Sequence, residues 1–308
     1  MKKLMSFYKW LFVVCTLLFV SCNDENVYTE YSNSSNTEIG NRIVSNSTLV
    51  AHIFNEKSEV VAPGVNSFYM DYLSDKGLAM KLFIYEVDLN VANVDVKTTM
   101  PNDGVAFGLQ EMTKQVALID RAGSKVVGAV NGDFFKTNGQ TQGVIHKGGK
   151  VIKDRFDDAG CSFFCIKNDK TAFIGDQSEY KAVKSDIRDA VGGRVWLVRD
   201  GVAVVSTANA VEPRTCIGVT KDNKVYMAVI DGRRFSYSNG MNYSDMSKLM
   251  VALGTDRAIN LDGGGSSTFV RRKSEDFAAG NFYFLNYPTD NAGQERKVAN
   301  GLAIVLLN

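Results

Sequence analysis

The sequence contains few of the residues that metal centres and disulfide frameworks require. Its 308 residues include five cysteines and two histidines, and His52 and His146 stand too far apart to suggest a zinc-site spacing. If Cys161 and Cys165 share a strand, they lie ~13 Å apart and cannot form a disulfide. We therefore interpret Cys161, Cys165 and Cys216 as small buried hydrophobic residues, with a Cys165–Cys216 disulfide left open.

The chain also lacks a strong charge of either sign. Lysine and arginine total 35 against 34 aspartates and glutamates, for a formal net charge of +1. Three of the lysines fall within the first 21 residues, which contain no acid, so the remainder is slightly acidic. No basic block occurs, and we expect no nucleic-acid partner. A hydrophobic fraction of 45% supports a globular body of one large domain or two small ones.

A hydrophobic run long enough to span a membrane is missing, but the N-terminus carries a shorter one. Residues 10–20 are mostly apolar and follow three lysines, a layout that predicts a signal peptide over residues 1–21. The run ends in Ser-Cys22 and resembles a bacterial lipoprotein signal, which implies that Cys22 is lipidated. An ordinary signal cut nearby is the alternative. We expect a lipid anchor in the cell envelope, at the periplasmic face or the outer surface.

Residues 22–41 are polar and aperiodic, which predicts a tether, and residues 42–308 are expected to form the functional domain. Apolar periodicity predicts one helix over Leu109–Ile119 and another that begins at Asn242 or Ser244 and ends at Gly254. Residues 272–291 lack periodicity and are expected to be a surface insertion. Strands are expected at 80–89, 93–97, 126–130, 162–166, 171–174, 195–198, 202–205, 215–219, 225–230, 258–261, 268–271 and 298–307.

These elements predict the α+β class, with a mixed, curved β-sheet, a few packed helices and a site on loops at strand ends. The most informative loop is Asn260-Leu-Asp262-Gly-Gly-Gly-Ser-Ser267. Three adjacent glycines are costly in a strand or helix, and they suit a backbone that approaches another group closely or adopts positive φ. Their N–H groups can line an anion beside Asp262. A sharp turn between two strands is the alternative.

A helix, a glycine and a strand precede both Asn131 and Asp262, each of which lies eight residues after its glycine. This parallel is a weak sign of internal duplication. It predicts that the Asn131–Asp133 and Asp262–Ser267 loops lie at equivalent strand ends and face one cleft. Coincidence remains the alternative, because helix–turn–strand units recur in many folds.

Four strand-end motifs together resemble the phosphodiester glycosidase family, over about residues 82–305. They are Asn131-Gly-Asp-Phe-Phe135, Pro213-Arg-Thr-Cys-Ile-Gly218, Asp231-Gly232 and Asn260-Leu-Asp-Gly-Gly-Gly-Ser266. The family cleaves the bond between a sugar's anomeric carbon and a phosphodiester oxygen. The resemblance therefore implies a hydrolase that acts on sugar-1-phosphodiesters in a glycan or cell-envelope polymer. Asp133 departs from the family, in which Gly or Ala often stands at this position.

This chemistry suggests a task for each residue. A phosphate leaves readily, so the main demand is to hold it and stabilise its growing charge. The guanidinium of Arg214 suits that demand. Asp262 and Asp231, and with less support Asp133, are candidates to activate water, act as nucleophile or stabilise an oxocarbenium-like sugar. The other expected substrate-binding residues are Asn131, Thr215, Gly263, Gly264, Gly265, Ser266 and Ser267.

Two other functions remain open at this stage. The domain could be a non-catalytic surface binder of phosphorylated glycans. It could instead be a metal-dependent phosphodiesterase that cleaves the P–O bond, with its aspartates holding Ca²⁺ or Mg²⁺. No residue spacing specifies such a metal site, and no cofactor is predicted.

Overall fold

The computed structural model of the protein describes residues 31–278 and 280–308, without the side chain of residue 291. The predicted signal peptide and lipidation site, Cys22, lie outside these residues. Residues 32–308 form one compact unit. Within the described range, no helix is long and apolar enough to cross a membrane.

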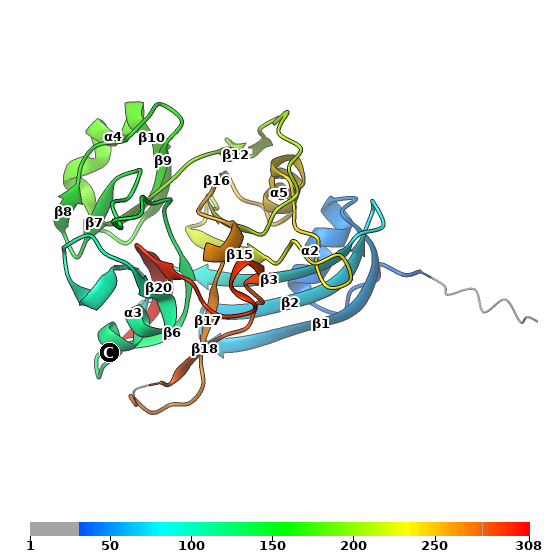
Figure 1. Ribbon diagram of the computed structural model, residues 1–308, viewed down its shortest axis with the longest axis horizontal. Coiled ribbons are helices and arrows are strands. Elements are labelled where there is room, and N and C mark those ends of the chain that lie inside the picture. The colour runs from blue at the N-terminus through cyan, green and yellow to red at the C-terminus, as the bar shows by residue number, and fades with distance from the viewer. Residues whose placement is uncertain (1–30, 279) are drawn as a thin grey trace, which may run out of the picture. The chain divides into compact units, whose positions relative to one another are not determined.

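The described strands pair antiparallel and form three main sheets, whose arrangement can be followed in Figure 1. The large sheet has the spatial order β1 (Val50–Ala62), β2 (Val65–Ser74), β3 (Ala79–Asp88), β15 (Lys224–Ile230), β14 (Arg214–Val219), β16 (Arg257–Asn260), β12 (Trp196–Arg199) and β13 (Val202–Ala203). The β9 sheet has the order β10 (Ala172–Asp176), β9 (Ser162–Lys167), β11 (Ile187–Gly193), β7 (Ile145–Lys147) and β8 (Lys150–Lys153). The β6 sheet has the order β18 (Phe282–Phe284), β17 (Phe269–Arg272), β6 (Ser124–Asn131), β20 (Gly301–Leu307) and β4 (Val94–Thr99), and β19 (Lys297–Val298) pairs separately with β5 (Gln110–Glu111).

Helices cover the outer faces of these sheets. The α-helices are α2 (Glu38–Asn46), α3 (Met112–Ile119), α4 (Gln177–Val183) and α5 (Tyr243–Ala252), and the short 3₁₀ turns are η1 (Pro101–Asp103), η2 (Lys184–Asp186), η3 (Gly264–Ser266) and η4 (Thr289–Asn291). Apolar side chains of α2 and α5 pack on the large sheet. Those of α3 pack on the β6 sheet, and those of α4 on the β9 sheet.

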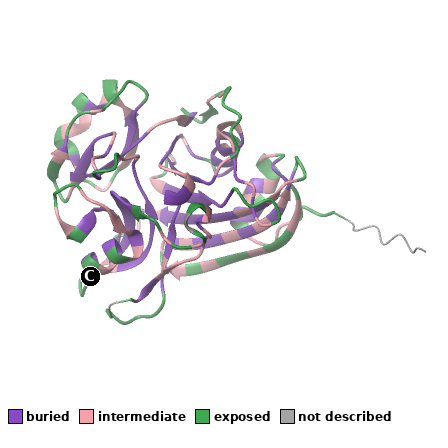
Figure 2. Ribbon diagram, viewed as in Figure 1, coloured by how far each residue is buried: buried purple, intermediate pink, exposed green. Residues whose placement is uncertain are grey.

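The inner faces of the three sheets share one apolar core. Strand β15 shows how the sequence produces this layering, because successive side chains of a strand point to opposite faces. Met227 and Val229 lie in the shared core, whereas Ala228 and Ile230 pack toward α2 and α5. A strand buried on both faces reads as an unbroken apolar run, and Figure 2 shows β15 and its neighbours largely buried.

Strand register brings the motif-bearing ends together. Arg214 at the start of β14 pairs with Ile230 at the end of β15, and Cys216 pairs with Asn260 at the end of β16. The residues that follow β15 and β16 therefore lie at the same end of the sheet as the first residue of β14. The predicted α+β class is confirmed, although the strands are divided among several antiparallel sheets and do not form one mixed sheet.

Two expectations about segments need correction. The predicted tether extends to residue 41, whereas α2 begins at Glu38 and buries Ile39 and Ile43. These two apolar residues among polar neighbours give too weak a pattern to predict a helix, which tertiary packing stabilises. Residues 272–291 are not simply a surface insertion, because β18 pairs with β17 and Asn286 is buried.

The three cysteines Cys161, Cys165 and Cys216 are free and buried, as the hydrophobic interpretation predicted. Cys165 packs between the β9 sheet and α4, whereas Cys216 packs under α2 and α5. The disulfide between them that the sequence left open is therefore absent.

Candidate functional site

Asn131, the last residue of β6, ties the motif loops together. Its side-chain oxygen accepts hydrogen bonds from the Thr215 hydroxyl at 2.7 Å and from the Thr268 N–H at 3.1 Å. Its amide nitrogen donates to the Asp262 carbonyl at 2.7 Å, and the Asp262 N–H donates to the Gly132 carbonyl at 2.9 Å. The two loops that the duplication argument placed together do meet. Contact of Asn131 and Thr215 with substrate remains a prediction, because these hydrogen bonds give both side chains a structural role.

Asp262 follows β16 and keeps partial exposure to solvent. One carboxylate oxygen accepts a hydrogen bond from the Gly263 N–H at 2.9 Å. Burial raises the pKa of Asp262 to about 6, although the Ser266 hydroxyl, the charge of Arg296 and the Gly263 N–H oppose the shift. A carboxyl group with this pKa exchanges protons near neutral pH, which is what general acid–base chemistry requires.

Asp133 lies on the other loop, with only 1% of its surface exposed. One carboxylate oxygen accepts from the Gly143 N–H at 2.7 Å, and the other has no hydrogen-bond partner among the described residues. Burial raises the pKa of Asp133 to about 7. The Gly143 N–H and the charge of Lys153 oppose this shift, and the negative charge of Asp262 adds to it. The site thus holds two electrostatically coupled carboxyl groups with raised pKa values.

The residue before Asp133, Gly132, lies where a side chain would not fit. The Gly132 N–H donates to the Asn300 carbonyl at 3.0 Å, and the Asp133 N–H donates to the Asn300 side-chain oxygen at 2.9 Å. A Cβ atom at Gly132 would lie 2.0 Å from that same side-chain oxygen. Asn300, which the sequence analysis did not identify, therefore fixes the loop only because residue 132 has no side chain.

Asp231 follows β15 but is held differently from Asp262. Its carboxylate accepts from Asn286 Nδ2 at 3.0 Å, from the Tyr287 N–H at 2.7 Å and from the Tyr237 hydroxyl at 3.1 Å. It is 1% exposed, and burial raises its pKa while these donors lower it. Asp231 connects three segments of chain, and its catalytic role stays a prediction.

Arg214 is directed away from the Asn131 cluster. Its neighbour on β14, Thr215, contacts Asn131, and successive strand residues face opposite ways. The guanidinium donates to the Met241 carbonyl at 3.1 Å, to the Tyr243 hydroxyl at 3.1 Å and to the Ala210 carbonyl at 3.0 Å. In this structure the guanidinium connects neighbouring loops, and its contact with a substrate phosphate stays a prediction.

The backbone of the glycine loop is partly occupied by internal contacts. The Gly263 N–H donates to Asp262, and the Gly264 N–H donates to the Pro213 carbonyl at 2.9 Å. The Gly265 N–H instead contributes to lowering the pKa of Asp290. A Cβ at Gly265 would lie 2.8 Å from the Asp290 Cβ, so glycine permits this close approach.

Arg233 and Asp290 were both missed by the sequence analysis. Arg233 Nη1 donates to Asp290 Oδ2 at 2.6 Å, and this hydrogen bond is the main cause of the lowered pKa of Asp290. Arg233 also pairs with Glu212 and has a φ of 61°, a conformation that non-glycine residues seldom adopt. The signal in the sequence was its position directly after Asp231-Gly232. Together, Arg233 and the Gly265 amide form a site that already holds a carboxylate.

The two serines complete the cluster. Both Ser266 and Ser267 are buried, and the Ser267 hydroxyl has no hydrogen-bond partner among the described residues. Over residues 31–278 and 280–308, no group of three or more His, Cys, Asp or Glu side chains is placed to hold a metal ion. The cluster therefore offers coupled carboxyl groups, hydroxyls and an occupied anion site.

The fold and the site together define an α+β domain with buried carboxyl groups at strand ends. The chain belongs to the phosphodiester glycosidase family, whose model matches residues 124–305. It is 29% identical over 245 residues to the SPbeta prophage-derived uncharacterized protein YomE of Bacillus subtilis, a match that covers 74% of this chain and 34% of that protein. It is also similar to the N-acetylglucosamine-1-phosphodiester alpha-N-acetylglucosaminidases of Bos taurus, 27% identical over 184 residues, and Homo sapiens, 28% identical over 189 residues.

Each of these two glycosidase matches covers 53% of this chain and 33% of the relative, so the chain spans about a third of the length of its curated relatives. The catalytic domain of the zebrafish N-acetylglucosamine-1-phosphodiester alpha-N-acetylglucosaminidase, auto-inhibited by its pro-peptide, has a similar structure. It gives a TM-score of 0.60 at 23% identity and covers 90% of this chain and 96% of that domain. A hypothetical protein from Synechocystis also gives a TM-score of 0.60, at 11% identity, with 82% and 64% covered. These structural likenesses show the fold alone.

Proposed function

We propose that this protein hydrolyses the bond between the anomeric carbon of a sugar and a phosphodiester oxygen, in a glycan or a cell-envelope polymer. The observation that carries the proposal is the coupled pair Asp133 and Asp262, with pKa values raised to about 7 and about 6, beside an arginine that already holds a carboxylate. Membership of the phosphodiester glycosidase family supports the reaction class.

Asp262 is our candidate for the group that acts on the sugar. It is the more exposed of the two carboxyl groups, and the lower pKa leaves it ionised over a wider pH range. An ionised carboxylate can activate water, attack the anomeric carbon or stabilise an oxocarbenium-like transition state. Asp133, which is buried and has the higher pKa, keeps its proton up to about pH 7 and so avoids a second negative charge near Asp262.

Arg233 and the Gly265 amide are our candidates for the phosphate-binding groups. They hold the Asp290 carboxylate in this structure, and a phosphate oxygen makes the same kind of charge-assisted hydrogen bond. We propose that the substrate phosphate takes the place of Asp290. Because a phosphate leaves readily, these donors supply the charge stabilisation that an acid must supply to a poorer leaving group.

We also propose that the enzyme acts at the cell envelope, anchored by a lipid on Cys22. The layout of residues 1–22 supports this proposal. Globomycin, an inhibitor of lipoprotein signal cleavage, should cause the precursor to accumulate in producing cells. Cys22→Ser should release the protein from the membrane fraction. No accumulation of precursor with globomycin, together with an unchanged membrane fraction for Cys22→Ser, would contradict lipidation.

The reaction can be tested in ¹⁸O-labelled water with a panel of sugar-1-phosphodiesters. Label in the released sugar is the expected result and means C–O cleavage. Label in the phosphate would overturn the glycosidase proposal in favour of P–O cleavage, for which loss of activity with a chelator is the further check. Binding without turnover across the panel would instead favour a non-catalytic glycan binder. Asp262→Asn is the matched variant, because it removes the charge and preserves the shape of the side chain.

A further inference from the structure

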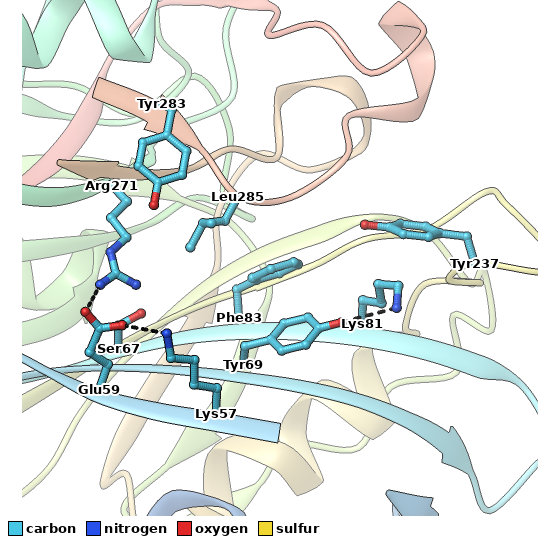
Figure 3. A pocket seen from close by; sticks show the side chains of 10 residues that line it. All are labelled: Lys57, Glu59, Ser67, Tyr69, Lys81, Phe83, Tyr237, Arg271, Tyr283 and Leu285. Atoms are coloured by element: carbon cyan, nitrogen blue, oxygen red, sulfur yellow. Dashed lines mark hydrogen bonds and ion pairs between the residues drawn. The ribbon is translucent and has the colours of Figure 1, made fainter. Parts of the chain in front are cut away.

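A separate pocket of 530 Å³ lies on the large sheet, and Figure 3 shows the side chains that line it. Its volume falls in the usual range of small-molecule sites. Strands β1, β2 and β3 form one side of the pocket, and β17, the β18 segment and the loop after β15 supply the others. Neither Asp133 nor Asp262 lines it, and the sequence motifs did not identify it.

Aromatic rings dominate the surface of this pocket. Tyr69 and Phe83 stand side by side on neighbouring strands, with ring centroids 5.2 Å apart and planes inclined by 42°. Tyr237 and Tyr283 lie across the hollow in Figure 3. The inclined pair forms a bent platform, which does not suit a planar base. It suits a puckered sugar ring, which has C–H groups on its face and hydroxyls at its edge.

Cationic groups stand at both ends of the platform. At one end, Lys81 donates to the Tyr69 hydroxyl at 3.2 Å, lies 4.9 Å from the centre of the Tyr237 ring and pairs with Asp71. At the other end, Arg271 pairs with Glu59.

Lys57 lies 3.2 Å from the same Glu59 carboxylate, so one acid serves two cations there. The surplus of positive charge among the lining residues favours a ligand with an anionic group.

The pocket is connected to the family motifs through Tyr237. Its ring lines the pocket, and its hydroxyl donates to the Asp231 carboxylate at 3.1 Å. The side chain of Asn286 then links Asp231 to the Ser267 carbonyl, at 3.0 Å and 2.8 Å. Three hydrogen bonds therefore connect the aromatic surface of the pocket to the glycine loop.

We propose that this pocket binds a pyranose residue that carries a carboxylate or phosphate group, as part of the glycan on which the enzyme acts. The link to that glycan rests on the proposed function. Affinity of the pocket for an anionic sugar does not rest on it, so the two can fail separately. The ring stacks on Tyr69, Phe83 and Tyr283, and the anion pairs with Arg271 or Lys81.

Calorimetric titration of the purified full-length chain tests the pocket. The probes are methyl glucuronide, glucose 6-phosphate and methyl glucoside, and Asp262→Asn is used throughout so that no turnover interferes. We expect one or both anionic sugars to bind at least ~5-fold more tightly than the neutral one. Comparison of methyl glucuronide with glucose 6-phosphate shows whether the pocket prefers a carboxylate or a phosphate group. Equal affinity for the three probes, or no binding of any of them, would overturn the proposal.

Variants locate the binding. Tyr283→Ala should weaken anionic-sugar binding by about 10-fold, and Arg271→Gln should abolish the preference over methyl glucoside. Phe54→Ala is the matched control, since Phe54 is an exposed aromatic residue on β1 that does not line the pocket. If Tyr283→Ala retains its melting temperature and its affinity, the sugar binds elsewhere and the proposal fails. Weakened binding in Tyr283→Ala, together with unchanged binding in Phe54→Ala, assigns the sugar to this pocket.

Discussion

The loops that follow β15 and β16 begin alike and are used differently. Each emerges from a buried strand as Asp-Gly, at Asp231 and at Asp262. Asp231 accepts three hydrogen bonds and is almost wholly buried. Asp262 accepts a hydrogen bond from the Gly263 N–H of its own loop and keeps some exposure. The same dipeptide at the same end of the sheet therefore gives one carboxylate, Asp231, that connects segments and another, Asp262, that is available for chemistry.

The number of hydrogen bonds that each carboxylate accepts distinguishes Asp231 from Asp262 better than burial does. Burial raises the pKa of both, to about 6 for Asp262. Three donors leave Asp231 little capacity to accept a proton or a water molecule without breaking existing contacts. Substitutions at the two positions should therefore affect different measurements.

The largest effect is expected from Asp262→Asn. We expect kcat to fall by about 10³-fold, because positioned carboxylates in acid–base roles contribute roughly 10²–10⁴-fold. The melting temperature should change little, because the amide can still accept from the Gly263 N–H. Initial rates on the diester found in the labelled-water assay, together with thermal unfolding, check this prediction. A kcat within tenfold of the parent enzyme would remove Asp262 from the mechanism.

Asp231→Asn should mainly destabilise the fold. The new NH₂ group faces donors from Asn286, Tyr287 and Tyr237, so at least one buried donor loses its acceptor. A buried unsatisfied group costs about 1–3 kcal/mol, which corresponds to a fall of roughly 3–10 °C in melting temperature for a domain of this size. We expect kcat to stay within tenfold. The reverse result, an unchanged melting temperature with a large loss of kcat, would restore the catalytic role that the sequence predicted for Asp231.

The sequence was sufficient for the elements whose signal is local. Apolar runs such as Val225–Ile230 and the helical pattern of Met246, Leu249 and Met250 became β15 and α5, and Asn242 does cap that helix. The meeting of Asn131 with Asp262 also followed from the parallel order of their elements. These features depend on periodicity and capping, which a single sequence records directly.

The remaining features depend on partners distant in sequence. Phosphate binding by Arg214 was predicted from the residue type alone. The direction of its guanidinium is set by hydrogen bonds to Met241 and Tyr243. Asn286 lies in a segment without periodicity, yet it holds Asp231 across 55 positions of the chain. Arg233 was recognisable only by its place after a motif. A side chain's partners come from tertiary structure, so its chemistry could be suggested by the sequence but not its direction.

A smaller effect that depends on pH is expected from Asp133→Asn. The pKa of Asp133 is raised from 3.8 to about 7 in the folded state, so the folded protein binds its proton more tightly than the unfolded chain. The stability this provides is complete below about pH 4 and is lost as pH rises through about 7. The melting temperature of Asp133→Asn relative to the parent should therefore rise between about pH 4 and pH 7 and level off above that range. A difference that is constant over that range would mean that Asp133 keeps an ordinary pKa.

The smallest effect is expected from Asp290→Ala, which tests the anion site formed by Arg233 and the Gly265 amide. If Asp290 occupies the place of the substrate phosphate on Arg233, its removal should lower the inhibition constant of inorganic phosphate by about 3–10-fold. The gain is modest because the Arg233–Asp290 pair is partly exposed, and such pairs contribute little. Glu275→Ala removes the acid of another exposed pair, with Lys125, and should leave the constant unchanged. Arg233→Gln should weaken the binding of phosphate whether or not Asp290 is present. If Asp290→Ala instead weakens phosphate, the carboxylate positions Arg233 for the ligand and does not stand in the ligand's place, and the anion site would lie beside Asp290.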